Sequence, residues 1–436
     1  MSLKFGTDGV RAEALTVLTT DYVAALGLAA AQVLGGGRWL IGRDTRESGA
    51  ALEAAVVAGL AAGGAEPVSL GVVPTPALAW MAQQSGCPAA MITASHNPWR
   101  DNGVKIFAPG GTKLPDAVER AIEAVLDPAH IAAFVGHDVV AAHSPAGDAY
   151  VQHLVGLTEP LDGLTIVLDC ANGAMSEAAP AVFRALGADV TVIHAQPNGR
   201  NINDHCGATH TQSLSAAVVA AGASMGLAFD GDGDRVIAVD HLGRAVDGDR
   251  LIALAALLLR EEGRLHHDTV VVTVMSNLGF HKAMAAAGIE VVTTAVGDRY
   301  VLEGLDAGGF SVGGEQSGHI IYRDLATTGD GLLAGLRLAQ FVHGHHDSLA
   351  HLAAEVMTSY PQVLVNVKVA QRHPHVADEL AAEIAAAEER LEGDGRILVR
   401  ASGTEPLIRV MVEAATDDLA RTVADDLAAV VLARFG

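Results

Sequence analysis

Residues 165–194 read TIVLDCANGAMSEAAPAVFRALGADVTVIH, and this stretch decides the fold class. A short apolar run at 165–168 is followed by a loop at 169–173, by a helix candidate that extends to Leu186, and by a second apolar run at 189–194. Short apolar runs bounded by turn-forming residues are typical of buried strands. A strand, a helix and a second strand in this order predict a parallel βαβ unit.

The same alternation of strands and helices extends along the chain on both sides of this stretch. Further strand candidates lie at 39–41, 89–93, 225–229, 269–274 and 290–294, and helix candidates lie at 50–62, 213–221, 250–261 and 280–287. In parallel sheets, ligands bind at the loops that follow the carboxyl ends of the strands. We therefore expect the functional residues in those loops.

The C-terminal part of the chain has a different pattern. Residues 363–369 have the alternating pattern of a strand. A helix candidate at 374–391, strands at 396–399 and 407–412, and a last helix at 417–435 follow. We predict three α/β domains with mixed or parallel sheets and a smaller C-terminal α+β domain, arranged around a central cleft. The predicted domains are 1–153, 154–250, 251–360 and 361–436.

Length and composition indicate a globular chain of several domains. Its 436 residues allow about two to four domains, and with 50% hydrophobic and 18% charged residues each can bury a core. A net charge of −23 argues against nucleic acid or a membrane surface as a partner. Three cysteines without CxxC spacing, and no apolar leader at 1–11, predict a reduced, cytoplasmic protein.

The most informative loop is Asp230-Gly-Asp-Gly-Asp-Arg235, which directly follows an apolar run. Its glycines let the backbone turn tightly, so that Asp230, Asp232 and Asp234 can converge. Concentrated carboxylate oxygens select Mg²⁺ or Ca²⁺. An EF-hand is excluded, because Arg235 stands where it needs glycine and His241 where it needs glutamate. The alternative, an acidic surface turn, would bring three carboxylates together without a cation.

Ser95 lies in a second loop that follows a strand candidate, in the segment Thr93-Ala-Ser-His-Asn-Pro98. Pro98 disfavours helix at Asn97 and holds the loop open. A serine hydroxyl can carry a phosphate covalently when a base and a metal activate it. Taken alone, the segment would be interpreted as an ordinary Asx-turn.

Two further loops are rich in polar groups. The segment 400–406, RASGTEP, combines an arginine, two hydroxyls and glycine-exposed backbone that suit a phosphate dianion, and Arg409 can add a second guanidinium group. In the segment 313–319, GGEQSGH, Glu315 and Ser317 can bind sugar hydroxyls. Without other motifs, a polar hairpin and a glycine-rich turn are the alternatives for these two segments.

A cluster of histidines before Asp347 also resembles a metal site. We interpret His343, His345, His346 and His351 instead as part of a solvated loop, because short motifs often match by chance.

Taken together, these loops resemble the α-D-phosphohexomutase superfamily, almost from end to end. Besides the four loops above, the resemblance includes FGTDGVR at 5–11 and GRDTR at 42–46. Within the superfamily, the chain is most similar to the branch that acts on glucosamine phosphates, through PNGRNIN at 197–203, CGATH at 206–210, TVMSNLG at 273–279 and VGDRYV at 296–301. Ala12 and Ala208 depart from the usual pattern, at positions to which no role is assigned.

The resemblance implies a four-domain isomerase whose active form carries a phosphate on Ser95. Asp230, Asp232 and Asp234 would hold Mg²⁺ together with a phosphoserine oxygen. The enzyme would give its phosphate to one end of a hexosamine monophosphate and take it back from the other, so that glucosamine 6-phosphate and glucosamine 1-phosphate interconvert. Glucosamine 1,6-bisphosphate or glucose 1,6-bisphosphate would be the activator, and the product would feed UDP-N-acetylglucosamine and cell-wall precursor synthesis. A homodimer is also a family expectation.

The resemblance assigns roles to the remaining polar residues. Phosphoryl transfer depends mainly on positioning and on neutralising charge. The reacting phosphate would be neutralised by Arg11, Lys105 and Arg235. The other phosphate would be bound by Arg400, Ser402, Gly403, Thr404 and Arg409. The sugar would be bound by Glu315, Ser317, His319 and Arg299. The general base stays open among Lys105, His96 and His319.

Three alternatives differ in what they need from these loops. A phosphoglucomutase or phosphomannomutase of the same superfamily would differ only in the substituent at the second carbon of the sugar. A metal-dependent sugar phosphatase would have no use for the second phosphate cradle around Ser402. A sugar-phosphate-binding protein without activity would not need Ser95 and all three aspartates.

Overall fold

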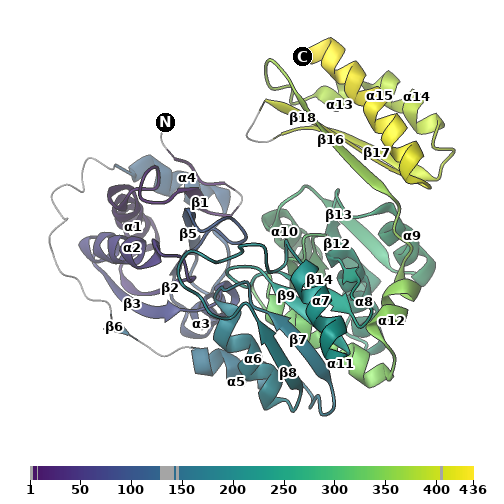
Figure 1. The fold of residues 1–436 in the computed structure, drawn as a ribbon. Helices are drawn as coiled ribbons and strands as arrows, with labels where there is room; N and C mark the ends of the chain where they lie inside the picture. The colour runs from purple at the N-terminus through teal and green to yellow at the C-terminus, as the bar shows by residue number, and fades with distance from the viewer. Residues whose placement is uncertain (1–2, 7, 128–141, 144–146, 403–405) are drawn as a thin grey trace. The chain divides into compact units, whose positions relative to one another are not determined.

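The computed structural model describes residues 3–6, 8–127, 142–143, 147–402 and 406–436 (Figure 1). Its contacts divide the chain into two compact units. The main unit consists of 1–275 and 289–354, and the C-terminal unit consists of 276–288 and 355–436. Gly403 and Thr404, which the sequence assigns to the phosphate cradle, lie outside the described residues.

The first sheet of the main unit is mixed and has the strand order β1-β5-β4-β2-β3-β6. Its strands are β1 (Val10–Glu13), β2 (Gly37–Arg43), β3 (Ala65–Val72), β4 (Ala89–Ile92), β5 (Asp101–Phe107) and β6 (Ala142–His143). β2 pairs in parallel with β3 and β4, whereas β5 pairs antiparallel with β4 and β1. The loop after β4 contains Ser95, and β5 carries Lys105.

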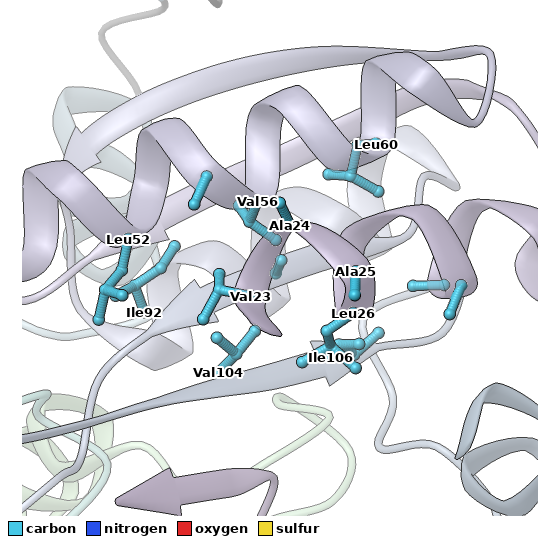
Figure 2. Packing of buried hydrophobic residues seen from close by; sticks show 14 of the residues in the cluster. Val23, Ala24, Ala25, Leu26, Leu52, Val56, Leu60, Ile92, Val104 and Ile106 are labelled. Carbon is cyan, nitrogen blue, oxygen red and sulfur yellow. The ribbon is translucent and has the colours of Figure 1, made fainter. Parts of the chain in front are cut away.

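Two helices, α1 (Thr20–Leu34) and α2 (Gly49–Ala62), pack closely against each other in the core beside this sheet. Figure 2 shows their apolar side chains meeting those of β4 and β5. The helices can approach this closely because Gly27 has no side chain. A Cβ at this position would lie only 2.6 Å from the carbonyl oxygen of Val56. Full burial of a side chain such as Leu26 stabilises the fold by about 1.5–3 kcal/mol. Helices α3 (Thr75–Ser85) and α4 (Asp116–Val125) complete this part.

The stretch at 165–194 forms the predicted parallel βαβ unit. It consists of β7 (Thr165–Asp169), α6 (Met175–Ala185) and β8 (Asp189–Ile193). The sheet has the order β11-β10-β9-β7-β8, and its other strands are β9 (Met225–Phe229), β10 (Val236–Asp240) and β11 (Ala245–Val246). The other helices of this part are α5 (Gly147–Gly156) and α7 (Gln212–Ala221). Every residue of β9 and β10 is buried, which places the aspartate loop between them at the end of two core strands.

The third sheet has the order β13-β12-β14-β15, with β15 antiparallel at one edge. Its strands are β12 (Thr269–Thr273), β13 (Glu290–Thr294), β14 (Val312–Gly314) and β15 (Ile320–Tyr322). The helices of this part are α8 (Gly248–Glu261), the short 3₁₀ helix η2 (His266–Asp268), α10 (Asp298–Gly308), α11 (Gly331–His345) and α12 (Leu349–Val356).

The interpretation of the histidine cluster as a loop is wrong for three of its four members. His343 and His345 lie in the last turn of α11, and His351 lies in α12. Helix α11 continues to His345, and most of its residues up to Val342 are buried. It ends where His346 adopts a left-handed conformation with φ 53°.

The C-terminal unit has an antiparallel sheet of order β16-β18-β17, made of β16 (Gln362–Lys368), β17 (Gly395–Ala401) and β18 (Leu407–Ala414). Helix α15 (Asp417–Phe435) packs on β16 and β18, and α9 (Leu278–Ala287) joins this unit. The single helix expected at 374–391 is two helices, α13 (Val376–Glu379) and α14 (Ala381–Glu389). They are separate because Leu380, buried in the core, leaves helical geometry at φ −110° and ψ 16°.

These sheets confirm the predicted fold class of α/β domains followed by a smaller C-terminal α+β part. The predicted boundaries at 153, 250 and 360 stay predictions.

In the described part of the chain, no helix combines the length and the apolar character that crossing a membrane requires.

Candidate active site

The loops of Ser95 and Asp230 meet inside the main unit. Ser95 is completely buried and follows β4, and its Oγ donates a hydrogen bond to Asp230 Oδ2 at 2.5 Å. The other neighbour of this hydroxyl is His96, whose Nδ1 lies 3.4 Å away. Ser95 has φ 53°, a left-handed conformation that side-chain-bearing residues rarely adopt. The two motifs that the sequence singled out therefore form one site.

The aspartate loop forms a group of buried carboxylates between β9 and β10. One oxygen from each of Asp230, Asp232 and Asp234 lies within 4.8 Å of the others. The backbone turns at Gly231, where a Cβ would lie 2.6 Å from the carbonyl oxygen of Ser95, and at Gly233, which has φ 77°. The convergence predicted from the glycines is thus what the structure has.

This carboxylate group suits a divalent cation. Asp232 Oδ1 and Asp234 Oδ1 are buried and make no hydrogen bond. Burial and the neighbouring charges of Asp234 and Asp232 raise the pKa of Asp230 well above its usual value. Like charges at this spacing destabilise one another unless a cation lies among them. Hard oxygen ligands with unused lone pairs are the donor set that Mg²⁺ prefers.

Lys105 neutralises part of the negative charge of the aspartate loop. Its Nζ lies 2.9 Å from Asp232 Oδ2, 2.9 Å from Asp234 Oδ2 and 2.9 Å from Asp8 Oδ2. Burial alone would lower the pKa of Lys105, but these three carboxylates hold it well above its usual value. Lys105 is therefore an ammonium group, and we expect it to neutralise charge and not to accept a proton.

The two histidines considered as general bases differ in charge. Burial and the positive charges of Arg235 and Arg11 lower the pKa of His96 to about 4, so that its ring is neutral at physiological pH. Burial would also lower the pKa of His319, but Asp234 and Asp298 raise it above its usual value. His319 thus favours the charged form, and His96 is the neutral ring beside the serine.

The expected arginines lie around the same carboxylates. Arg11 forms an ion pair with Asp8. The backbone N–H of Arg235 donates to Asp230 Oδ1 at 3.2 Å, and the ion-pair partner of its side chain is Asp234, at 3.8 Å. Arg11, Lys105 and Arg235 therefore surround the same group of carboxylates, and their role at the reacting phosphate stays a prediction.

The loop expected to bind sugar connects β14 to β15. Glu315 is buried, and its Oε1 accepts a hydrogen bond from Gly297 N at 3.0 Å, while Ser317 is exposed. Arg299, expected at the sugar, is ion-paired with Asp116 and Glu119 on α4. A sugar-binding role of Arg299 stays a prediction, and in this structure Arg299 links α10 to α4.

The expected phosphate cradle lies in the C-terminal unit. Arg400 and Arg409 are direct cross-strand partners on β17 and β18. Burial and the positive charge of Arg409 lower the pKa of Arg400. Ser402 is buried beside them at the end of β17, and its N–H donates to Leu407 O at 2.8 Å. Two arginines at directly opposite positions of neighbouring strands can bind the same phosphate group.

Several residues of the site escaped the sequence analysis. Lys113 pairs with both Asp8 and Asp298, and Thr75 Oγ1 donates to Asp232 Oδ2 at 2.6 Å. Lys113 and Thr75 belong to no motif, so the sequence carries no signal for them. Asp8 and Asp298 lie in motifs that were noticed, but only the fold shows that they face Lys113.

Four family models match the chain in order along its length. They describe phosphoglucomutase/phosphomannomutase alpha/beta/alpha domain I at residues 2–130, domain II at 148–243, domain III at 247–360 and the C-terminal domain at 364–430. Together the matched segments contain all the site residues named above.

Curated relatives resemble the chain over nearly its whole length. A phosphoglucosamine mutase of Frankia casuarinae is 54% identical over 98% of this chain and 97% of its own length. A phosphoglucosamine mutase of Rhodococcus opacus is 52% identical over 99% of each.

Solved structures share the fold. A phosphoglucomutase/phosphomannomutase family protein of Burkholderia thailandensis has a TM-score of 0.80 and 25% identity, over 98% of this chain and 97% of its own. An N-acetylphosphoglucosamine mutase of Aspergillus fumigatus, in complex with GlcNAc-6P and magnesium, has a TM-score of 0.70 and 20% identity. This similarity covers 100% of this chain and 96% of that one.

Proposed function

Since this chain belongs to the phosphoglucomutase/phosphomannomutase family, we propose that it carries the transferable phosphate on Ser95. Its activity is that of a phosphoglucosamine mutase, an isomerase, as the names of relatives about 50% identical over the full length indicate. It interconverts glucosamine 6-phosphate and glucosamine 1-phosphate. The observation that supports the role of Ser95 is its buried hydroxyl, 2.5 Å from the first carboxylate of the aspartate loop.

Mg²⁺ fits the aspartate loop. Asp230, Asp232 and Asp234 would hold the ion through oxygens that converge within 4.8 Å. Asp232 and Asp234 each have one buried oxygen, Oδ1, that makes no hydrogen bond. When bound, Mg²⁺ would supply positive charge beside the phosphoryl oxygens.

The residues of this chain provide the rest of the charge balance. Phosphorylated Ser95 gives its phosphoryl group to a hydroxyl of the bound hexosamine monophosphate. The P–Oγ bond breaks and a P–O bond forms at the sugar, while the sugar hydroxyl gives its proton to a base and Oγ of Ser95 takes up a proton to become a hydroxyl. Arg11, Lys105 and Arg235 balance the negative charge of the transferring group. Because Lys105 is an ammonium group and His319 favours the charged form, we assign the role of proton acceptor to His96, whose ring is neutral.

The reaction then runs in reverse from the other end of the sugar. The bisphosphate turns over, and Ser95 takes back the phosphate that the substrate originally carried. The site that holds the idle phosphate must therefore bind either end of the molecule. Arg400 and Arg409, which are cross-strand partners, together with Ser402 at the end of β17, suit that task, since arginine binds phosphate oxygens in pairs.

The role of Ser95 is tested by intact-mass analysis and turnover. The wild-type protein, incubated with glucose 1,6-bisphosphate, should gain the mass of one phosphate and convert glucosamine 6-phosphate. Ser95→Ala should lose both. Ser85→Ala, which removes an exposed hydroxyl whose hydrogen bonds stay within its own helix, serves as the control and should keep both. A Ser95→Ala protein with near-wild-type turnover would refute the proposal.

The substrate assignment is tested with competing sugar phosphates. Turnover of glucose 1-phosphate and mannose 1-phosphate should be at least about tenfold slower than that of glucosamine 1-phosphate, which is about 1.4 kcal/mol of transition-state discrimination. The reverse order would favour a phosphoglucomutase or phosphomannomutase. Release of free phosphate faster than isomerisation would indicate a phosphatase.

Activation by a hexose or hexosamine 1,6-bisphosphate, a cytoplasmic location and a homodimer belong to the same proposal. Free Cys87, Cys170 and Cys206 are compatible with a reducing compartment. Light scattering after size-exclusion chromatography measures the oligomeric state directly.

A further inference from the structure

Arg46 is directed at the backbone of the serine loop. It follows β2 and is only 2% exposed. Its Nη2 donates to Ser95 O at 2.8 Å and to Asn97 O at 2.8 Å. Its Nη1 donates to Asp101 O at 3.0 Å and also to Pro98 O. One buried guanidinium group therefore holds four carbonyl groups of the loop.

A second set of contacts fixes the amide side of the serine. Asp44 Oδ2 accepts hydrogen bonds from Arg46 Nε at 2.9 Å and from Thr93 Oγ1 at 2.7 Å. Thr93 Oγ1 in turn accepts from Ser95 N at 2.9 Å. The N–H and the C=O of Ser95 are thus both tied to one buried network, which orients the arginine as well.

Asn203, in the segment between β8 and α7, donates to two of the same carbonyl groups. Its Nδ2 donates to Ser95 O at 2.9 Å and to Asn97 O at 3.2 Å, and the residue is 8% exposed. It has φ 57°, a conformation that asparagine tolerates better than most residues. Its own N–H donates to Ala171 O at 2.9 Å, which anchors it to the loop after β7.

The serine needs such support because its backbone is strained. A left-handed conformation is unfavourable for a non-glycine residue and persists only where the surroundings hold it. Ser95 O also faces Gly231, where there is no room for a side chain. If the backbone relaxed, Oγ would leave its place beside Asp230.

We propose that Arg46 and Asn203 form a clamp that fixes the backbone of Ser95 and thereby sets the rate of phosphoryl transfer in both directions. They are positioning residues, since they hold the loop through its carbonyl groups. The inference rests on the proposed role of Ser95 as phosphate carrier. It predicts a loss of kcat without a comparable change in substrate binding, because the clamp holds the reacting oxygen and not the sugar.

Three variants test the clamp. Asn203→Asp keeps the shape and the left-handed preference but replaces the amide donor by an acceptor. Asn203→Gly removes the donor and tolerates the same backbone angle. Arg46→Lys keeps a charge beside Asp44 but cannot reach four carbonyl groups. Asn198→Asp is the control, because this exposed residue in the same segment uses its Oδ1 as an acceptor, which aspartate retains.

Each clamp variant should lower kcat by about 10- to 100-fold, since a displacement of about 1 Å costs a factor of this size. KM for glucosamine 6-phosphate should stay within about threefold of wild type. Loading of dephosphorylated enzyme by glucose 1,6-bisphosphate, followed by intact mass, should slow by a similar factor. Asn198→Asp should behave as wild type in all three measurements.

Two results overturn the clamp. In one, kcat stays within about twofold of wild type in the clamp variants. In the other, kcat falls only together with the melting temperature and a rising KM, which assigns Arg46 and Asn203 to general stability. If Ser95→Ala is inactive but the clamp variants behave as wild type, this inference alone is refuted. If Ser95→Ala is active, the proposed function itself is refuted.

Discussion

Replacing Lys105 by methionine should destabilise the main unit more than any exposed ion pair could. The ammonium group is 4% exposed and lies 2.9 Å from oxygens of Asp8, Asp232 and Asp234. A pair of unit charges about 4 Å apart gains about 4 kcal/mol at an effective dielectric constant of about 20. Three such pairs gain about 12 kcal/mol, from which desolvation removes several kcal/mol per ion.

The net effect of the substitution is therefore smaller than the gross attraction. Removing one partner of a buried ion pair costs about 3–5 kcal/mol, because the remaining charge stays buried. Lys105→Met leaves three carboxylates without their shared cation, so we expect about 4–5 kcal/mol in the absence of added metal. Arg120→Met is the control. Arg120 is exposed and 3.8 Å from exposed Asp116, and its loss should cost less than about 1 kcal/mol.

The difference between wild type and Lys105→Met should depend on pH. Burial would raise the pKa values of Asp8 and Asp234, but positive charges, with Lys105 first, hold both well below their usual value. Such carboxyl groups stabilise the fold above their unfolded pKa of about 3.9, and this stabilisation is lost as the pH falls further. The variant lacks it, so the difference should be largest above about pH 5 and shrink below about pH 4.

Urea unfolding followed by tryptophan fluorescence measures this difference. The protein has three tryptophans, Trp39, Trp80 and Trp99, and all belong to the main unit, so the signal reports that unit alone. The measurement is made in EDTA at pH 7.5 and at about pH 3. A loss below about 1 kcal/mol, or a loss that is the same at both pH values, would refute the reasoning.

Three further predictions concern other charged groups. Burial raises the pKa of Asp330, which accepts a hydrogen bond from Tyr150, to about 6, so the fold loses stability as the pH rises from about 4 to about 6. Asp330→Asn should flatten this dependence and raise the melting temperature at pH 7.5 but not at pH 4; an unchanged slope in a scanning-fluorimetry series contradicts this. Mg²⁺ should raise the melting temperature of the wild type, and Asp232→Asn should abolish both this shift and at least about 99% of turnover, whereas a full shift in the variant would place the ion elsewhere. Arg409→Gln should raise KM for glucosamine 6-phosphate by about tenfold or more, because in this variant only Arg400 remains to hold the idle phosphate. Loading of the serine should stay near wild type, and equal effects on both steps would contradict this assignment.

Local patterns were sufficient to predict the elements that carry the site. The apolar runs at 89–93 and 225–229 are strands, and the loops after them carry Ser95 and Asp230 as expected. Short apolar runs followed by glycine or polar turns are strong signals, because they depend only on neighbouring residues. The pattern was less reliable at 374–391, where burial of Leu380 divides one expected helix into two.

The sequence by itself determined the chemistry of this protein: a serine, three aspartates and a set of cationic residues in loops after strands, in the order of one enzyme family. The tertiary structure decided how these groups act on one another. Only the fold holds the pKa of Lys105 well above its usual value, although burial alone would lower it, and brings the pKa of His96 down to about 4, because pKa values depend on burial and on charges from distant segments. Only the fold directs Arg46 and Asn203 at the backbone of Ser95, because hydrogen bonds between residues 49 and 108 positions apart leave no periodic signal in the sequence.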